Sequence, residues 1–174
     1  METIKLIALL ILISFILISC SQSPEKMLSY QEKPFRALLT WQTNGASFIA
    51  VMTSYPASDT LTIEFTSPAS VSGITVKKSA EQTTVTLDGI EITAPELSRF
   101  ASIAKFFNID GSITKSSVTS ISGAKANYIE ILDASKEKYR LYLYSASGLP
   151  RRIEGELYGK QITLDFISFE PIPE

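Results

Sequence analysis

The sequence predicts a mainly β (α+β) fold: a strongly curved antiparallel sheet that forms an open half-barrel, closed by one main helix on its concave side. Two turn pairs, Asn44-Gly45 and Asp88-Gly89, lie between apolar runs, and such pairs are strong hairpin signals. One later stretch repeats apolar residues at helical spacing. A single amphipathic helix inside a long antiparallel meander must bury its apolar stripe on the sheet, which favours a curved sheet.

The chain begins with a short apolar segment that is typical of an export signal. Residues 6–19 follow Lys5 and span about 14 residues, fewer than the roughly 20 that a membrane-spanning helix needs. Cys20 closes the segment, flanked by Ser19 and Ser21. The pattern indicates cleavage before Cys20. An ordinary secretory signal with an incidental cysteine and an uncleaved single-pass anchor are the alternatives.

Residues 17–20 resemble the lipobox of bacterial lipoproteins, in which the cysteine is linked to diacylglycerol, becomes the new N-terminus and is acylated. This resemblance implies that Cys20 carries a covalent lipid, such as one with palmitate chains. The protein would then be held at a membrane of the cell envelope and face outward from the cytoplasmic membrane, with the outer membrane as an option where the host has one. Cys20 is the only cysteine, so no intramolecular disulfide can form.

Length and composition predict one domain after the signal. We expect a signal peptide over 1–19, a lipidated N-terminus and tether over 20–33, and a single half-barrel domain over 34–174; a short helix from Pro24 to Tyr30 is the alternative to a tether. The net charge of −2 indicates no nucleic-acid surface. Histidine is absent, which removes Ser-His-Asp and Cys-His catalysis and imidazole metal sites. We therefore expect neither an enzyme nor a metal, and no cofactor apart from the covalent lipid.

The first hairpin turns at Asn44-Gly45. With these two residues as the loop, Trp41 faces Phe48 and Ala37 faces Met52, so one face of the hairpin is apolar and aromatic. The other face is mixed, which indicates that both faces are at least partly covered.

The remaining strands follow from alternation and turn residues. The Asp88-Gly89 hairpin is expected to place Val85, Leu87, Ile90 and Ile92 together on an inner face. We expect about nine strands in all. Apart from the two hairpins, they span 60–66, 73–78, 127–132, 138–145, 151–158 and 161–169.

The main helix is expected from about Pro95 to Phe107. Thr93 stands three residues before Glu96, as in a capping box, and Pro95 is tolerated in a first helical turn. Phe100 belongs to the apolar stripe that continues to Phe107.

The mature chain is similar to the LolA/LolB/LppX superfamily of bacterial envelope proteins. The similarity rests on the lipobox followed by residues 34–37, the Trp41 hairpin, and the segments 61–68, 148–154 and 162–166. The resemblance implies an open half-barrel with helices over an apolar cavity, in a family whose members carry lipoproteins or lipids.

Six apolar side chains are candidates for lining such a cavity: Trp41, Phe48, Met52, Phe65, Phe100 and Phe166. Ordinary core packing is the alternative, because aromatic and Met stripes on strands are usually core. The first interpretation predicts a membrane-anchored envelope lipoprotein that binds or carries an acyl chain, a lipid or a lipoprotein. The second predicts a structural or protein-interaction lipoprotein with a packed core and no ligand.

A turn at Gly159-Lys160 would place Glu154 opposite Asp165. Like charges across a strand pair destabilise by up to about 1 kcal/mol unless they are neutralised. Arg152 and Arg140 are the expected neutralisers on a solvated face. A carboxylate pair for metal binding or acid-base chemistry is the alternative.

Overall fold

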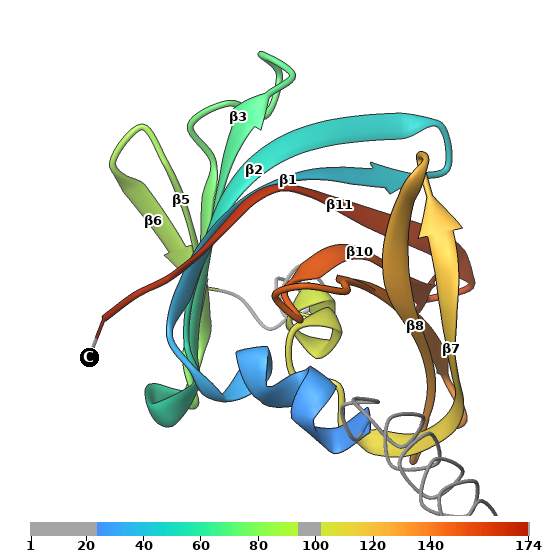
Figure 1. Cartoon of the computed structure of the whole chain (residues 1–174). Coiled ribbons are helices and arrows are strands. Elements are labelled where there is room, and N and C mark those ends of the chain that lie inside the picture. Colours follow the sequence, from blue (N-terminus) through green and yellow to red (C-terminus); the bar gives the residue numbers. More distant parts are fainter. Residues whose placement is uncertain (1–23, 94–101, 174) are drawn as a thin grey trace, which may run out of the picture.

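The computed structural model describes residues 24–93 and 102–173, which form one antiparallel sheet that curves around two short helices (Figure 1). The helices on its concave side are η1 (Pro24–Glu32) and η4 (Ser102–Phe106). The strands are β1 (Phe35–Thr43), β2 (Ala46–Tyr55), β3 (Thr60–Ser67), β4 (Thr75–Lys78), β5 (Thr83–Leu87), β6 (Ile90–Thr93), β7 (Gly111–Ile121), β8 (Ala124–Asp133), β9 (Lys138–Tyr144), β10 (Pro150–Leu157) and β11 (Lys160–Pro171), with η2 (Pro56–Ser58) between β2 and β3.

The order of the strands is β6-β5-β4-β3-β2-β1-β11-β10-β9-β8-β7. Every neighbour in the sheet is also a neighbour along the chain, except where β1 meets β11. Within the described ranges the edge strands β6 and β7 do not pair with each other, so the sheet is open, as expected. The described residues form eleven strands rather than about nine.

The first hairpin has the predicted register. Asn44 and Gly45 both have positive φ, 43° and 81°, as a two-residue hairpin turn requires. Trp41 pairs with Phe48 and Ala37 pairs with Met52. Because side chains alternate between the faces of a strand, this register fixes which side chains of β1 and β2 face the concave side.

The core lies between the concave face of the sheet and the two helices. Ile103 and Phe106 of η4 are buried, and so are Met27 and Tyr30 of η1. The segment Pro24–Glu32, which was expected to be part of a tether or a short helix, is therefore a 3-10 helix. It packs onto the sheet from Met27 onward. Burial raises the pKa of Tyr30 above its usual value.

The expected main helix is not confirmed. Its first part, 94–101, lies outside the described residues, and Phe100 with it. The described remainder, Ser102–Phe106, is a 3-10 helix. Within the described ranges, no helix is long and apolar enough to cross a membrane.

Strand β7 was not predicted from the sequence. Its eleven residues are mostly Ser and Thr with scattered Ile and Val, and none of their side chains is buried. An edge strand with no buried face lacks the apolar alternation on which strand prediction depends.

The expected burial of the second hairpin is wrong, although its register is right. Leu87 pairs with Ile90 and Val85 pairs with Ile92, as predicted. However, Leu87, Ile90 and Ile92 are 43%, 68% and 53% exposed. The hairpin lies at the edge of the sheet, beyond the part of the concave face that the described helices cover (Figure 1).

The predicted turn between β10 and β11 is wrong by one residue. Tyr158 and Gly159 take the positive φ values, 52° and 74°, so Leu157 pairs with Lys160. Glu154 therefore faces Thr163, and Asp165 faces Arg152 instead of another carboxylate. A register change of two residues keeps every side chain on its predicted face, because side chains alternate with a period of two.

The outer face of these strands is a ladder of ion pairs. Arg152 donates to both carboxylate oxygens of Asp165, from Nε at 2.6 Å and from Nη2 at 3.0 Å. These bonds raise the pKa of the Arg152 guanidinium. Arg140 and Arg152 each lie 3.7 Å from a carboxylate oxygen of Glu154. Both arginines are thus the neutralisers that the sequence predicted.

Glu130 extends this ladder on β8. It accepts hydrogen bonds from Tyr128 at 3.1 Å and Thr114 at 3.2 Å, and Lys138 Nζ lies 3.3 Å away. Desolvation, the largest single influence, raises the pKa of Glu130. The contacts with Lys138, Tyr128 and Thr114 together outweigh it, so the pKa lies below its usual value.

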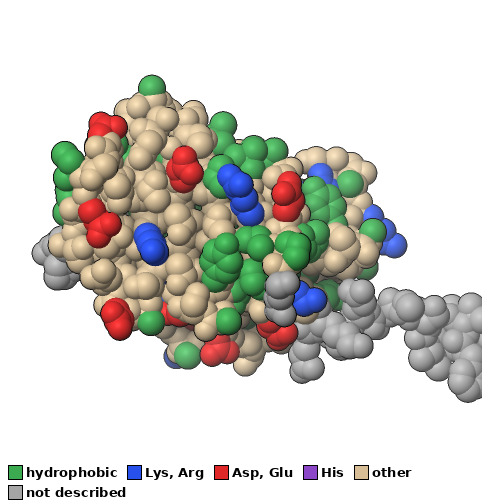
Figure 2. Space-filling view, turned by 90° about the vertical axis from the view of Figure 1, so that its left-hand side faces the viewer, with side chains coloured by type: hydrophobic (Ala, Val, Ile, Leu, Met, Phe, Trp, Pro, Cys, Tyr) green, Lys and Arg blue, Asp and Glu red, His purple; other side chains and the backbone are tan. Residues whose placement is uncertain are grey.

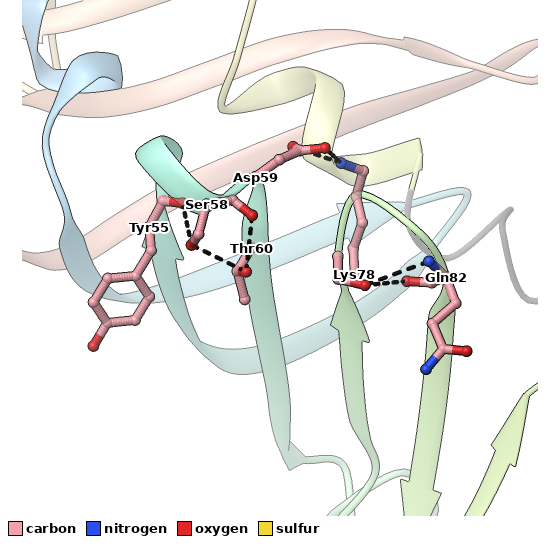
Figure 3. Close-up of polar contacts among 7 residues, drawn as sticks. Tyr55, Ser58, Asp59, Thr60, Lys78 and Gln82 are labelled. Carbon is pink, nitrogen blue, oxygen red and sulfur yellow. Dashed lines mark hydrogen bonds and ion pairs between the residues drawn. The ribbon is translucent and has the colours of Figure 1, made fainter.

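At the other half of the sheet, a local ion pair joins η2 to β4 (Figure 3). Lys78 Nζ lies 2.7 and 2.8 Å from the two carboxylate oxygens of Asp59. Asp59 ends η2 with a φ of 46° and donates its N–H to the Pro56 carbonyl at 3.0 Å. An exposed pair of this kind contributes little to stability, about 1 kcal/mol at most.

Gly155 of β10 is expected to resist substitution. A Cβ there would lie 2.8 Å from Cε1 of Phe106 and 3.1 Å from Cδ1 of Tyr139, both of which are buried. We expect Gly155→Ala to lower the free energy of unfolding by about 1–3 kcal/mol through overpacking, as measured by urea denaturation. The neighbouring, exposed Glu156→Ala is the matched control and should stay within about 0.5 kcal/mol of the wild type. Equal effects of the two variants would show that the Phe106 ring yields without cost.

The Glu130 ladder predicts an acid-sensitive contribution to stability. Because folding lowers the pKa of Glu130, its contribution is present above the unfolded pKa of about 4.3 and is lost as the pH falls through the folded pKa. Glu130→Gln should therefore lower the urea midpoint at about pH 6, with the difference from the wild type shrinking toward about pH 3. Glu91→Gln on β6 is the control, since the described residues give Glu91 no ion pair. A Glu130→Gln difference that does not depend on pH would contradict the prediction.

Candidate ligand-binding site

Three of the predicted lining residues form one aromatic cluster on the concave face. Trp41 of β1, Phe48 of β2 and Phe65 of β3 have ring centroids 5.8 to 6.0 Å apart. They come together for two reasons. The β1–β2 turn pairs Trp41 with Phe48, and the pairing of β2 with β3 places Phe65 opposite Ala50, two residues from Phe48. Phe48 and Phe65 meet edge to face, and Trp41 is tilted against both.

The cluster is only partly covered by the rest of the protein. Phe65 is buried, whereas Trp41 and Phe48 are half-buried. Ala46, which pairs with Thr43 beside the turn, is exposed. The cluster therefore lies toward the β1–β2 turn, where the concave face opens to solvent.

Among the described residues, two polar atoms beside this cluster find no hydrogen-bond partner. They are Nε1 of Trp41 and Oγ1 of Thr43, and both atoms are buried. The two residues are two positions apart on β1, so their side chains lie on the same face of the sheet. An unpaired buried polar group costs on the order of 1–3 kcal/mol. The apolar cluster thus has an unused donor, and a hydroxyl that can donate or accept, at its margin.

Met52 and Phe166 are core residues in the structure. Met52 is 1% exposed and pairs with Ala37 on one side and Ile63 on the other. Phe166 is buried in a second aromatic group, with ring centroids 6.1 Å from Phe107 and 5.9 Å from Phe169. The structure therefore does not bring Phe166 into the Trp41 cluster. Phe100 lies outside the described residues.

This second aromatic group was not predicted from the sequence. It joins η1, the start of β1, the residue that follows η4 and the end of β11; its members are Tyr30, Phe35, Phe107, Phe166 and Phe169. Phe35 and Phe169 stack with their centroids 4.5 Å apart. The pairing of β1 with β11 brings these rings together, and no local pattern in the sequence signals that pairing.

The structure also has a polar cleft of about 430 Å³ that was not predicted from the sequence. It lies where β9 and β10 separate after the Arg140–Glu154 pair, next to the β10–β11 turn. Lys138 and Arg140 line it from β9, and Glu154 and Glu156 line it from β10. The lining is charged on both walls, so an apolar ligand would have to desolvate several charges to enter.

The described residues contain no cluster of metal-ligating side chains. Among them, no three His, Cys, Asp or Glu side chains gather as metal ligands do. On the side of the molecule in Figure 2, acidic and basic side chains are scattered singly among polar and hydrophobic ones, without a basic patch. Of the described features, the concave aromatic cluster is the one that suits an apolar ligand.

This protein matches known proteins in its three-dimensional structure and not in its sequence. No family model matches the sequence, and no curated protein matches it. An uncharacterized conserved protein from Thermus thermophilus matches with a TM-score of 0.57 and 15% identity, over 88% of this chain and 90% of that chain. MucB matches with a TM-score of 0.51 and 11% identity, over 86% of this chain and 57% of that chain. A LolA superfamily protein from Nitrosomonas europaea matches with a TM-score of 0.47 and 14% identity, over 88% and 96%.

At these identities the comparisons concern the fold alone. The curved open sheet of this chain is shared with the Thermus thermophilus protein and with MucB. An open, curved antiparallel sheet is also the feature that the sequence resemblance implies for the fold.

Proposed function

We propose that the protein is a membrane-anchored lipoprotein of the cell envelope that binds an apolar ligand in its half-barrel. The ligand would be an acyl chain, as a free lipid or as part of a lipoprotein. The observation that carries the proposal is the half-buried cluster of Trp41 and Phe48 over Phe65. Large aromatic side chains left half-buried on the inner side of a curved sheet provide apolar surface that a ligand can cover.

The surroundings of the cluster favour a ligand with a polar end. The rings of Trp41 and Phe48 would contact the acyl chain of the ligand, with Phe65 beneath them. An ester or carboxylate oxygen would accept a hydrogen bond from Trp41 Nε1 or Thr43 Oγ1 after a small rotation of these side chains, and would thereby relieve the cost of their unpaired state. The proposed role is binding and carriage, without a chemical step.

A structural or protein-interaction lipoprotein is the second candidate. The burial of Met52 and Phe166 favours it, since two of the six expected lining residues are packed core. In that case the exposed part of the Trp41 cluster would be a small local gap in the packing.

Tryptophan fluorescence separates the two candidates, because Trp41 is the only tryptophan in the chain. The chain from Ser21 onward, prepared without detergent, is titrated with stearic acid that carries bromine in mid-chain as a contact quencher. Ligand binding at the cluster predicts saturable quenching of Trp41. Phe48→Ala should raise the dissociation constant about tenfold, since losing the contact of one such ring costs on the order of 1.4 kcal/mol or more.

The matched control is Tyr55→Ala, which removes an exposed aromatic ring from the far end of the same strand. It should leave the quenching curve unchanged, and circular dichroism should show both variants folded. Absence of quenching in the folded wild type, or quenching that Phe48→Ala does not weaken, would favour the packed-core interaction protein.

The membrane anchor is tested separately. One acyl chain holds a protein only marginally, whereas two or three hold it stably, because each buried methylene contributes roughly 0.8 kcal/mol. Cys20→Ser should therefore move the full-length protein from the membrane fraction to the soluble fraction or block its processing. Mass spectrometry of the wild type should find the lipid on Cys20 at a new N-terminus. An unmodified thiol at Cys20 would contradict the lipoprotein proposal and leave the ligand-binding test unaffected.

A further inference from the structure

Strand β7 is a long edge of the sheet on which none of the other described strands lies. Among the described strands it pairs with β8 alone, and eight of its eleven side chains are exposed. Val118, near its middle, is 61% exposed although it is apolar. An edge strand presents a row of unpaired main-chain N–H and C=O groups, which can pair with another strand.

The usual protection of edge strands is confined to the start of β7. Charges, prolines and bulges normally prevent edges from pairing with other chains. In β7, the one charged residue is Lys115, and the bulge lies between Ile113 and Lys115. The stretch 116–121 contains no charge, no proline and no bulge. The opposite edge, β6, is only four residues long and carries Glu91 in its middle.

The turn after β7 determines which main-chain groups point outward. Ser122 and Gly123 have φ values of 46° and 75°, and Ile121 pairs with Ala124, which defines a two-residue hairpin. The pair that flanks such a turn is hydrogen-bonded, and hydrogen-bonded pairs alternate along antiparallel strands. Ile121, Thr119 and Ser117 therefore bond to β8. The residues between and beside them, Ser120, Val118 and Ser116, direct their N–H and C=O groups away from the sheet.

We propose that two copies of the chain pair through β7 as a two-fold symmetric, antiparallel dimer centred on Val118. In this register Val118 meets Val118 of the second copy, and Ser116 meets Ser120 in both directions. All the outward groups of these three residues then find partners, because each pair exchanges two N–H···O=C bonds. Any other centre that makes hydrogen-bonded pairs leaves some of these groups unpaired.

The side chains fit the same register. Two valine side chains would lie together at the axis, which covers an apolar group that the single chain leaves exposed. Lys115 would lie opposite Ile121 of the second copy, and Ser117 opposite Thr119, so no like charges face each other across the strand pair. A contact confined to one strand is small, so we expect a weak, concentration-dependent dimer that a shared membrane surface would favour. This proposal does not depend on ligand binding.

Cysteine cross-linking in the full-length protein, in its native membrane, tests the dimer. Cα atoms of a hydrogen-bonded antiparallel pair lie about 5.5 Å apart, within the range that a disulfide spans. After mild oxidation, Val118→Cys should give a disulfide-linked dimer of twice the 19.1 kDa chain on a non-reducing gel, less any cleaved signal. Glu91→Cys on β6 is the matched control at the other edge, and the wild type measures any background from Cys20. Cross-linking of Val118→Cys no greater than that of Glu91→Cys would overturn the proposal.

The register has its own test. Chains with Lys115→Cys and chains with Ile121→Cys, carrying different tags, should cross-link with each other but not with themselves. Adding Ser116→Pro to Val118→Cys removes an outward N–H without touching the bonds to β8, and should reduce the cross-linking at least about tenfold. Ser120→Pro is the second such variant, in case the first does not fold. Undiminished cross-linking in folded proline variants would show that the contact is not main-chain pairing, and would overturn the proposal.

Discussion

The pairing of β1 with β11 is the constraint on which the rest of the architecture depends. Strands β1 to β6 and strands β7 to β11 are each a simple meander, in which every strand pairs with its neighbour along the chain. One ladder, from Phe35↔Pro171 to Thr43↔Ile162, joins the two meanders into a single curved sheet. The stacked rings of Phe35 and Phe169 and the helix residues packed against them lie along this junction.

The parts of the fold that could be predicted from the sequence are those that depend on the residues in tight turns. Asn44-Gly45 and Asp88-Gly89 both adopt positive φ, and both hairpins have the register that the sequence implies. The β10–β11 turn was misplaced because Tyr158, rather than Lys160, takes the positive φ beside Gly159. Tyrosine is an uncommon residue in that conformation, so the sequence carried no signal for it. Each side chain of β10 and β11 was still assigned to the correct face of the sheet, because the predicted register was wrong by an even number of residues.

What the sequence could not provide is the arrangement of distant strands. The cluster of Trp41 and Phe48 follows from one turn, so the sequence was sufficient to predict it. Phe166 was assigned to the same lining on its apolar character, but β11 aligns it with Leu39, while Leu164 is the residue beside Trp41. The bulge between Leu38 and Leu39 contributes to this alignment, and such irregularities have no sequence signature here. Likewise, the contact of Phe106 with Gly155 depends on where η4 lies over the sheet.

The junction of β1 with β11 also affects how the protein can be made. The partner of β1 is β11, so all the strands between them precede the residues that this ladder needs. Contacts between residues so far apart in sequence form slowly, because a long loop must close before they are gained. Until then, the growing chain exposes the apolar side chains of its future concave face. We therefore expect a protein of this topology to be most prone to aggregation before β11 is available to pair with β1.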